Sequence, residues 1–226
     1  YKAICNKLID IDRVSDAFTI SEYMLDKTQI VAVHIYYINQ LSKNRFKEKA
    51  INHIPDIVNL IKSSCPLTTH LGDDISEWPE RGFSYLQLSD FFFDISDYDK
   101  SKEYTSKALL EIDSIPKDYT LETGPIAWNE TIYNETYKST FLGEVIERCL
   151  KMNQIDESIN LINQISPEVE HYVTYNDGIG YTKHVYKFYL FKIAWILFKE
   201  NNLEALEFIL NNNKVEFDDK TDFYSK

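Results

Sequence analysis

Glycine and proline are scarce in this chain, since each occurs only six times in 226 residues. A β-sandwich or β-barrel needs turn residues at about every eight to twelve positions. The scarcity therefore disfavours an all-β fold and favours long helices joined by few turns. Cysteine is also rare: Cys5, Cys65 and Cys149 lie far apart, which excludes a disulfide framework and a paired metal-binding motif. We accordingly expect a reducing, cytoplasmic environment.

Basic residues are outnumbered, with 24 Lys and Arg against 36 Asp and Glu, so the net charge is −12. A surface of this sign repels the phosphate backbone, and we expect no nucleic-acid partner. The acidic surface either keeps the protein soluble or attracts basic proteins. The most apolar stretch, Val185 to Phe198, contains Lys187 and Lys192 and is too short for a membrane span, so we expect no membrane partner. Because Tyr1 is not a natural start, we expect a longer parent chain.

Sequence motifs for catalysis are missing as well. The chain has no HExxH metal motif, no GxSxG nucleophile elbow and no glycine-rich phosphate loop. The five histidines are not spaced as paired metal ligands. The sequence therefore predicts neither an enzyme nor a cofactor or metal site. Asn129 and Asn134 begin glycosylation sequons, which matter only if the chain enters a secretory compartment.

Five segments of the chain share one plan: an apolar helix, a short polar turn and a second amphipathic helix. We expect one domain over 1–226, with repeats at about 1–27, 31–62, 83–115, 139–166 and 184–212. The predicted turns are Asp10–Arg13, Ser42–Phe46, Ser96–Asp97, Met152–Gln154 and Glu200–Asn202. Such a repeat predicts helix pairs that bury their apolar faces by stacking on their neighbours.

The third segment has the clearest pattern. Small or aromatic residues recur in its second helix at offsets that keep them on one face: Tyr98, Ser101, Thr105 and Ala108. Its first helix has apolar or small residues at helical spacing: Tyr85, Leu88, Ser89 and Phe92. The second segment fits least well, because its turn carries an extra residue.

The plan resembles the tetratricopeptide repeat family, most closely over Tyr85 to Ala108. The resemblance implies an all-α fold, a right-handed superhelix of about five stacked antiparallel helix pairs with long inter-repeat connections. Only the first two copies are about 33 residues apart, close to the family's period, whereas later copies are separated by roughly 50. The family also implies a concave groove, lined by first helices, that binds a peptide.

The extra length lies in three connections, which are Pro66–Gly82, Pro116–Tyr137 and Ser166–Lys183. A proline near the start of each predicts a helix end. The connections are rich in aromatic residues, namely Trp78, Trp128, Tyr172, Tyr175 and Tyr181. Two readings remain open: a lateral binding edge, or helix extensions that pack aromatic side chains into the stack.

The groove geometry selects candidate binding residues one position beyond the buried small residue of each first helix, and their neighbours. Asparagine amides could hold a peptide backbone, carboxylates would favour a basic side chain, and aromatic rings would anchor apolar ones. Aromatic residues near Trp195 could instead belong to the core. The candidate set is Asn6, Tyr36, Asn39, Gln87, Asp90, Phe93, Glu144, Glu147, Lys192, Trp195 and Phe198.

The leading functional hypothesis is a non-catalytic scaffold or adaptor that binds a protein or peptide segment, with a basic one favoured by the net charge. A second hypothesis is a ligand-gated regulator, because the chain looks similar to the repeat domains of bacterial peptide-pheromone receptors. A third is an acidic inhibitor or immunity-type protein that masks a basic toxin. An upstream helix-turn-helix would favour the regulator, and salt-sensitive binding to a cationic protein would favour the inhibitor.

Overall fold

The chain divides into two compact units, Tyr1–Tyr137 and Lys138–Lys226. The expectation of a single domain stays a prediction. The computed structural model describes residues 1–25, 27–65, 69–71, 74–78, 80–112, 119–123, 128–132, 134–165, 170–174 and 180–212.

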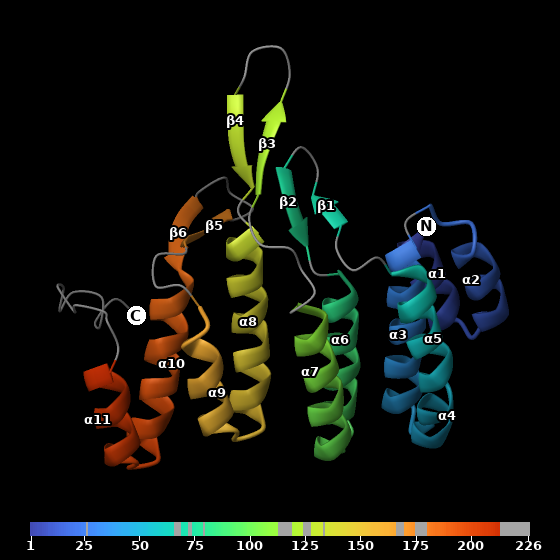
Figure 1. Ribbon diagram of the computed structural model, residues 1–226. Helices are drawn as coiled ribbons and strands as arrows, with labels where there is room; N and C mark the ends of the chain where they lie inside the picture. The colour runs from blue at the N-terminus through green and yellow to red at the C-terminus, as the bar shows by residue number, and fades with distance from the viewer. Residues whose placement is uncertain are drawn as a thin grey trace. The chain divides into compact units, whose positions relative to one another are not determined.

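Antiparallel helix pairs make up most of the first unit (Figure 1). Its helices are α1 (Lys2–Asp10), α2 (Val14–Ser21), α3 (Lys27–Lys43), α4 (Lys47–Asn52), α5 (Ile54–Ser64), α6 (Glu80–Asp94) and α7 (Tyr98–Ile112). The first helices pack on one another in chain order, since α1 contacts α3 and α3 contacts α6. The expectation of helices that pack on helices is confirmed.

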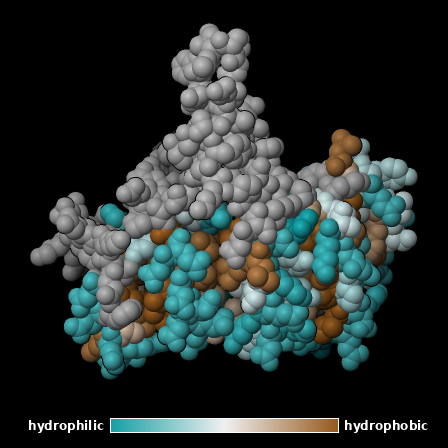
Figure 2. Space-filling view, in the orientation of Figure 1, coloured by the Kyte–Doolittle hydropathy of each residue, from teal (hydrophilic) through white to brown (hydrophobic). Residues whose placement is uncertain are grey.

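The second unit contains α8 (Asn134–Lys151) from residue 138 onward, α9 (Ile155–Ile162), α10 (Val185–Lys199) and α11 (Leu203–Asn212). Helix α10 packs against both α9 and α11. On the face shown in Figure 2, polar side chains cover the outer surface of the helices and apolar ones lie in the seams between them.

The five predicted turns share one backbone geometry. Among the described residues other than glycine, positive φ angles of 55° to 67° occur at Asp12, Arg45, Ser96, Asn153 and Asn201, one in each turn. The following N–H then bonds the carbonyl five residues earlier, as Arg13 does to Leu8 at 2.8 Å, and the five such distances are 2.8 or 2.9 Å. This is the Schellman arrangement, which satisfies carbonyls at a helix end and reverses the chain.

Small or apolar residues are buried where the paired helices cross. In each segment, the residue of the first helix that lies seven positions before the positive-φ residue is buried. These residues are Cys5, Ile38, Ser89, Ile146 and Ala194. Five residues after the positive-φ residue the second helix carries Ala17, Ala50, Ser101 or Ser158 in the first four segments, each at most 1% exposed. Small side chains let the two backbones approach, which explains the recurrence at fixed distances from the turn.

A hydroxyl network joins α6 and α7 at their crossing. Ser89 Oγ lies 2.9 Å from the Ser101 carbonyl oxygen and 2.7 Å from Oγ1 of Thr105. The Ser101 hydroxyl donates in return to the Ser89 carbonyl at 2.9 Å. All three side chains are buried, so these bonds compensate the loss of water around them.

The second helix of the second segment is broken into α4 and α5 at His53. Pro55 stands at the start of α5, where a helix tolerates a residue without an N–H. The sequence reading placed one helix across this point and missed the break. At this break His53 contacts His34 of α3.

Each long connection contains a two-stranded antiparallel hairpin, which is the main difference from the expected arrangement. The strands are β1 (Thr69–Leu71) with β2 (Asp74–Trp78), β3 (Tyr119–Thr123) with β4 (Trp128–Ile132), and β5 (Glu170–Thr174) with β6 (Gly180–His184). Their registers pair Thr69 with Trp78, Thr123 with Trp128, and Tyr172 with Thr182. The helix-extension reading is therefore wrong for these residues.

The physical reason lies in local composition. The paired segments are rich in threonine and aromatic residues, which favour extended backbone. The low glycine and proline content argues against a large sheet, but a single hairpin needs only one turn. The helices end before the prolines as expected, at Ser64, Ile112 and Ile162. Tyr175 and the prolines that open the connections lie outside the described residues.

Candidate functional site

A hollow of about 430 Å³ opens between the first helices α3 and α6 of the first unit. Helix α6 supplies Phe91, which is buried, and the exposed Asp94. Helix α3 supplies a polar wall of Tyr36, Asn39, Gln40, Ser42 and Lys43. The accessible groups around the hollow are thus mainly amide, hydroxyl and charged ones, since Phe91 is only 1% exposed.

The orientation of Tyr36 is set by α1. Its hydroxyl donates to Oδ1 of Asp10 at 2.7 Å, across the contact between α1 and α3. This hydrogen bond to a carboxylate raises the pKa of Tyr36, because ionisation would remove the donated proton. The phenol is therefore held as a neutral donor whose ring lines the hollow.

Two of the six candidates in the first unit, Tyr36 and Asn39, line this hollow, and its described lining does not include the other four. Phe93 packs against Tyr98 with ring centroids 5.5 Å apart. The amide oxygen of Asn6 is buried on α1 without a hydrogen-bond partner among the described atoms. Gln87 and Asp90 are half-buried on α6.

Sequence reasoning missed the other lining residues, which are Gln40, Ser42, Lys43, Phe91 and Asp94. The sequence rule selected the residue directly after each buried small residue. The hollow lies nearer the turn and includes Asp94, five residues after Ser89. A signal did exist, since Asn39 and Lys43 are four residues apart and so lie on one face of α3.

In the second unit, two candidates meet between α8 and α10, and a third, Glu144, lies on α8. Lys192 Nζ forms an ion pair with Oε1 of Glu147. Glu144 pairs along α8 with Arg148, whose NH1 lies 3.1 Å from Oε2 of Glu144. The carboxylate of Glu147 was expected to attract a basic partner, but it already has a cationic neighbour on the adjacent helix. A basic ligand would have to compete with Lys192 there.

The remaining candidates, Trp195 and Phe198, form an exposed stack on α10. Their ring centroids are 6.0 Å apart with an interplanar angle of 21°. Trp195 is 52% exposed and Phe198 58% exposed, so these two rings are not core residues, whereas Tyr186 and Tyr189 on the same helix are buried. The ammonium of Lys199 lies 5.0 Å from the centre of the Trp195 ring. This arrangement keeps a large apolar surface in solvent beside a positive charge.

Phe188 extends this aromatic surface by two turns of α10, and the sequence analysis did not select it. It is 42% exposed, and Lys192 lies 5.8 Å from its ring centre. Its spacing of seven residues from Trp195 is the signal that could have identified it, since such residues share a helix face.

Comparison with family models, curated proteins and solved structures finds no match to this chain. The tetratricopeptide resemblance therefore rests on the residues and turns of this chain alone.

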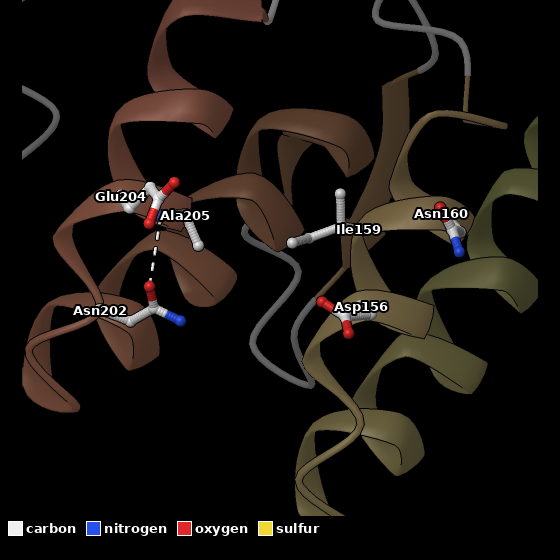
Figure 3. Close-up of a pocket in the computed structure, with 6 residues that line it drawn as sticks. All are labelled: Asp156, Ile159, Asn160, Asn202, Glu204 and Ala205. Atoms are coloured by element: carbon white, nitrogen blue, oxygen red, sulfur yellow. Dashed lines mark hydrogen bonds between the residues drawn. The ribbon is translucent and has the colours of Figure 1, made fainter.

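A second hollow, of about 490 Å³, lies between the second helices α9 and α11 of the second unit. Figure 3 shows its lining: Asp156, Ile159 and Asn160 from α9, with Asn202, Glu204 and Ala205 at the start of α11. Oδ1 of Asn202 accepts from the Ala205 N–H at 3.3 Å, and both acids lie in the first turn of their helices. These groups stabilise helix N-termini, and we assign no ligand to them.

In the described part of the chain, no group of three or more His, Cys, Asp and Glu side chains could hold a metal ion. The three cysteines are buried and form no disulfide bond, and burial raises the pKa of the Cys149 thiol to about 12. A thiol in that state is a poor nucleophile. Among the described helices, none is long and apolar enough to cross a membrane.

Proposed function

We propose that this chain is a non-catalytic binding scaffold that holds an extended protein segment against its first helices. In this proposal the helix pairs, about five in all, stack in the right-handed superhelix typical of tetratricopeptide repeats. The ligand lies along the concave side, where α1, α3 and α6 follow one another in the first unit and α8 and α10 in the second.

The shared turn supports the repeat part of this proposal. Five Schellman turns with matching hydrogen bonds, and small buried residues at fixed distances from them, are what a duplicated helix hairpin would retain. The contacts of α1 with α3 and of α3 with α6 are those of consecutive repeats, since each repeat in such a stack packs on the next.

The observation that carries the binding proposal is the hollow between α3 and α6. Its volume of about 430 Å³ falls in the lower range of ligand sites and suits one or two side chains of a peptide. Asn39 and Gln40 each offer a donor and an acceptor, which is what a peptide backbone requires. Asp94, which is exposed, would favour a basic side chain of the ligand.

The aromatic surface of α10 supports a second contact region in the second unit. Phe188, Trp195 and Phe198 are large rings in solvent, and tryptophan in particular is enriched where binding energy concentrates. Apolar side chains of the bound segment would cover these rings. The net charge of −12 would favour a segment with basic residues and would speed its association at low salt.

Selection from a displayed library of random peptides, with the full chain as bait, tests the proposal. Selected peptides are then titrated against the wild-type protein and Asn39→Ala. We expect that variant to weaken binding by about tenfold or more, the effect of losing one or two backbone hydrogen bonds that the ligand cannot replace. Asn59→Ala, an exposed asparagine on α5, is the matched control and should bind like the wild type.

Two results would overturn the proposal. One is a failure to select any peptide that binds with saturation. The other is a set of peptides that bind wild type, Asn39→Ala and Asn59→Ala with equal affinity and are unaffected by changes on α10.

A further inference from the structure

Two histidines from different helical segments are in direct contact inside the first unit. Nδ1 of His34 on α3 lies 2.8 Å from Nε2 of His53, at the break between α4 and α5. The two rings are nearly parallel, with an interplanar angle of 12°. Phe18 of α2 stacks on His34 at 4.1 Å, and Tyr37 meets the His53 ring edge-on at 5.5 Å. The pair therefore lies where α2, α3 and α5 meet.

The contact with the Asp56 carboxylate determines which ring nitrogens of the pair carry hydrogen. Nδ1 of His53 lies 3.2 Å from Oδ2 of Asp56, so this nitrogen carries a hydrogen that it donates to the carboxylate. In the neutral imidazole, Nε2 of His53 then has a lone pair and must accept from Nδ1–H of His34. Both rings are thus in the Nδ1–H form, and Nε2 of His34 is the remaining basic nitrogen.

One additional proton is compatible with this geometry. It binds at Nε2 of His34, and the positive charge can pass to His53 if the hydrogen between the rings shifts to the His53 side. Either way, one hydrogen still lies between the two nitrogens, and the Asp56 carboxylate faces the cation. A second proton would place two N–H groups against each other at 2.8 Å and two positive charges in adjacent stacked rings.

We propose that His34 and His53 form an acid-sensing pair that accepts one proton readily and a second only in stronger acid, and that this second proton loosens the junction of α3 with α2 and α5. The pair differs in this respect from two independent surface histidines, each of which would take its own proton near neutral pH.

The surroundings of the pair oppose the second proton. Burial, and then the neighbouring charge of His53, lower the pKa of His34 from 6.5 to about 4. Burial also lowers the pKa of His53, while Asp56 opposes that shift. The charged and titratable groups that face the junction are Asp56 of α5 and, above the Tyr37 ring at 5.9 Å, Lys49 of α4. Helix α2 contributes the uncharged ring of Phe18.

The inference goes beyond the proposed binding function and does not depend on it. Helix α3 nevertheless carries both features, since Tyr36 and Asn39 line the hollow while His34 and Tyr37 face the junction. Loosening of the junction would therefore also move Tyr36 and Asn39, which line the hollow.

Nitrogen-15 NMR of the histidine side chains in the 226-residue chain tests the proposal, because the spectrum reports both tautomer and protonation. Above pH 8 we expect His34 and His53 in the Nδ1–H form. On acidification the pair should show two steps, separated by at least one pH unit, with the second near pH 4. The three other histidines, His70, His171 and His184, provide internal references.

Substitution adds a second measurement. In His34→Phe the stacked ring is kept but its proton site is lost, so His53 should titrate in one step at a higher pH than the second step of the wild type. In Asp56→Asn the first step should move to lower pH. The matched control, His171→Phe, should leave both steps of the pair unchanged.

The proposal fails if His34 and His53 are in the Nε2–H form, or if each titrates in a single independent step near pH 6.5. The wild-type titration alone decides this, so a variant that does not fold leaves the test intact.

Discussion

The backbone of Gly143 on α8 lies directly against the phenol ring of Tyr189 on α10. A β-carbon built at Gly143 would lie 2.6 Å from Cζ and 2.8 Å from the hydroxyl oxygen of Tyr189. Both residues are buried, and burial raises the pKa of Tyr189 because the phenolate would be poorly solvated there. The contact explains why the two helices can approach at this point in the second unit.

Gly143→Ala should therefore destabilise the protein by about 1–3 kcal/mol, the usual range for an overpacked core. Urea unfolding followed by circular dichroism measures the change. Shortening the opposing side chain should relieve the clash, so Gly143→Ala combined with Tyr189→Leu should cost less than the sum of the two single substitutions. An additive double variant would show that the two residues are not in contact.

The positive-φ residues make a prediction about the turns. Arg45 has a φ of 67°, a conformation that costs a residue with a β-carbon about 1–2 kcal/mol and glycine much less. Arg45→Gly should stabilise the protein by about 0.5–1 kcal/mol. Lys43→Gly, two residues earlier and still within α3, should instead destabilise it by a similar amount. Denaturation midpoints that move in the same direction for both variants would contradict the turn geometry.

The hydroxyl network at the crossing of α6 and α7 should act as a coupled unit. A double-mutant cycle with Ser89→Ala and Thr105→Val should give a coupling energy of about 0.5–1.5 kcal/mol, because their oxygens lie 2.7 Å apart in the core. A control cycle of Ser89→Ala with Ser21→Ala should be additive, since Ser21 lies on α2 and donates to the Phe18 carbonyl of the same helix, away from the network. Equal coupling in both cycles would rule out a specific network.

Stability should decrease in acid through His34. Burial and the neighbouring charge of His53 lower the pKa of His34 from the ordinary 6.5 to about 4, so the second proton of the pair binds only near this value. Between pH 6.5 and 4 the unfolded chain, whose two histidines titrate independently, therefore binds more protons than the folded chain. The free energy of unfolding therefore falls as pH falls from 6.5 toward 4, and the contribution is fully present above 6.5. The loss is at most about 3 kcal/mol, and less because the ring is only half-buried.

The measurement is the unfolding free energy of wild type and His34→Phe at pH 7 and pH 4.5. The wild type should lose more unfolding free energy than His34→Phe between pH 7 and pH 4.5. Any stability advantage of the wild type at pH 7 should therefore become smaller, or reverse, at pH 4.5. A parallel fall in both proteins would assign the acid sensitivity to other groups.

The aromatic surface of α10 should matter for binding and little for folding. Trp195 is 52% exposed, so Trp195→Ala should change the free energy of unfolding by no more than about 0.5–1 kcal/mol. Loss of a central aromatic anchor should weaken peptide binding by about 2 kcal/mol or more. Calorimetry with a selected peptide checks this, with Tyr23→Ala, at the exposed aromatic residue after α2, as the control.

The helices and their turns could be predicted from sequence because both are local. Apolar periodicity marks the buried face of a helix, and each polar turn falls at the positive-φ residue that ends its first helix. Ser89 and Ser101 were recognised as buried small residues for the same reason. The hairpins are local features as well, since threonine and aromatic residues favour extended backbone, but the low overall glycine and proline content argued for long helices instead of strands.

The site residues depended on tertiary structure. Helical spacing identified Tyr36 and Asn39, yet only the packing of α3 against α6 brought Phe91 and Asp94 to the same hollow. Likewise, the sequence by itself determined that α10 carries many aromatic residues, and the fold decided which of them remain in solvent. His34 and His53, nineteen residues apart, show the limit most clearly. Their contact depends on the break between α4 and α5 at His53 and on the packing of three helices, because proximity between distant residues is set by how elements pack.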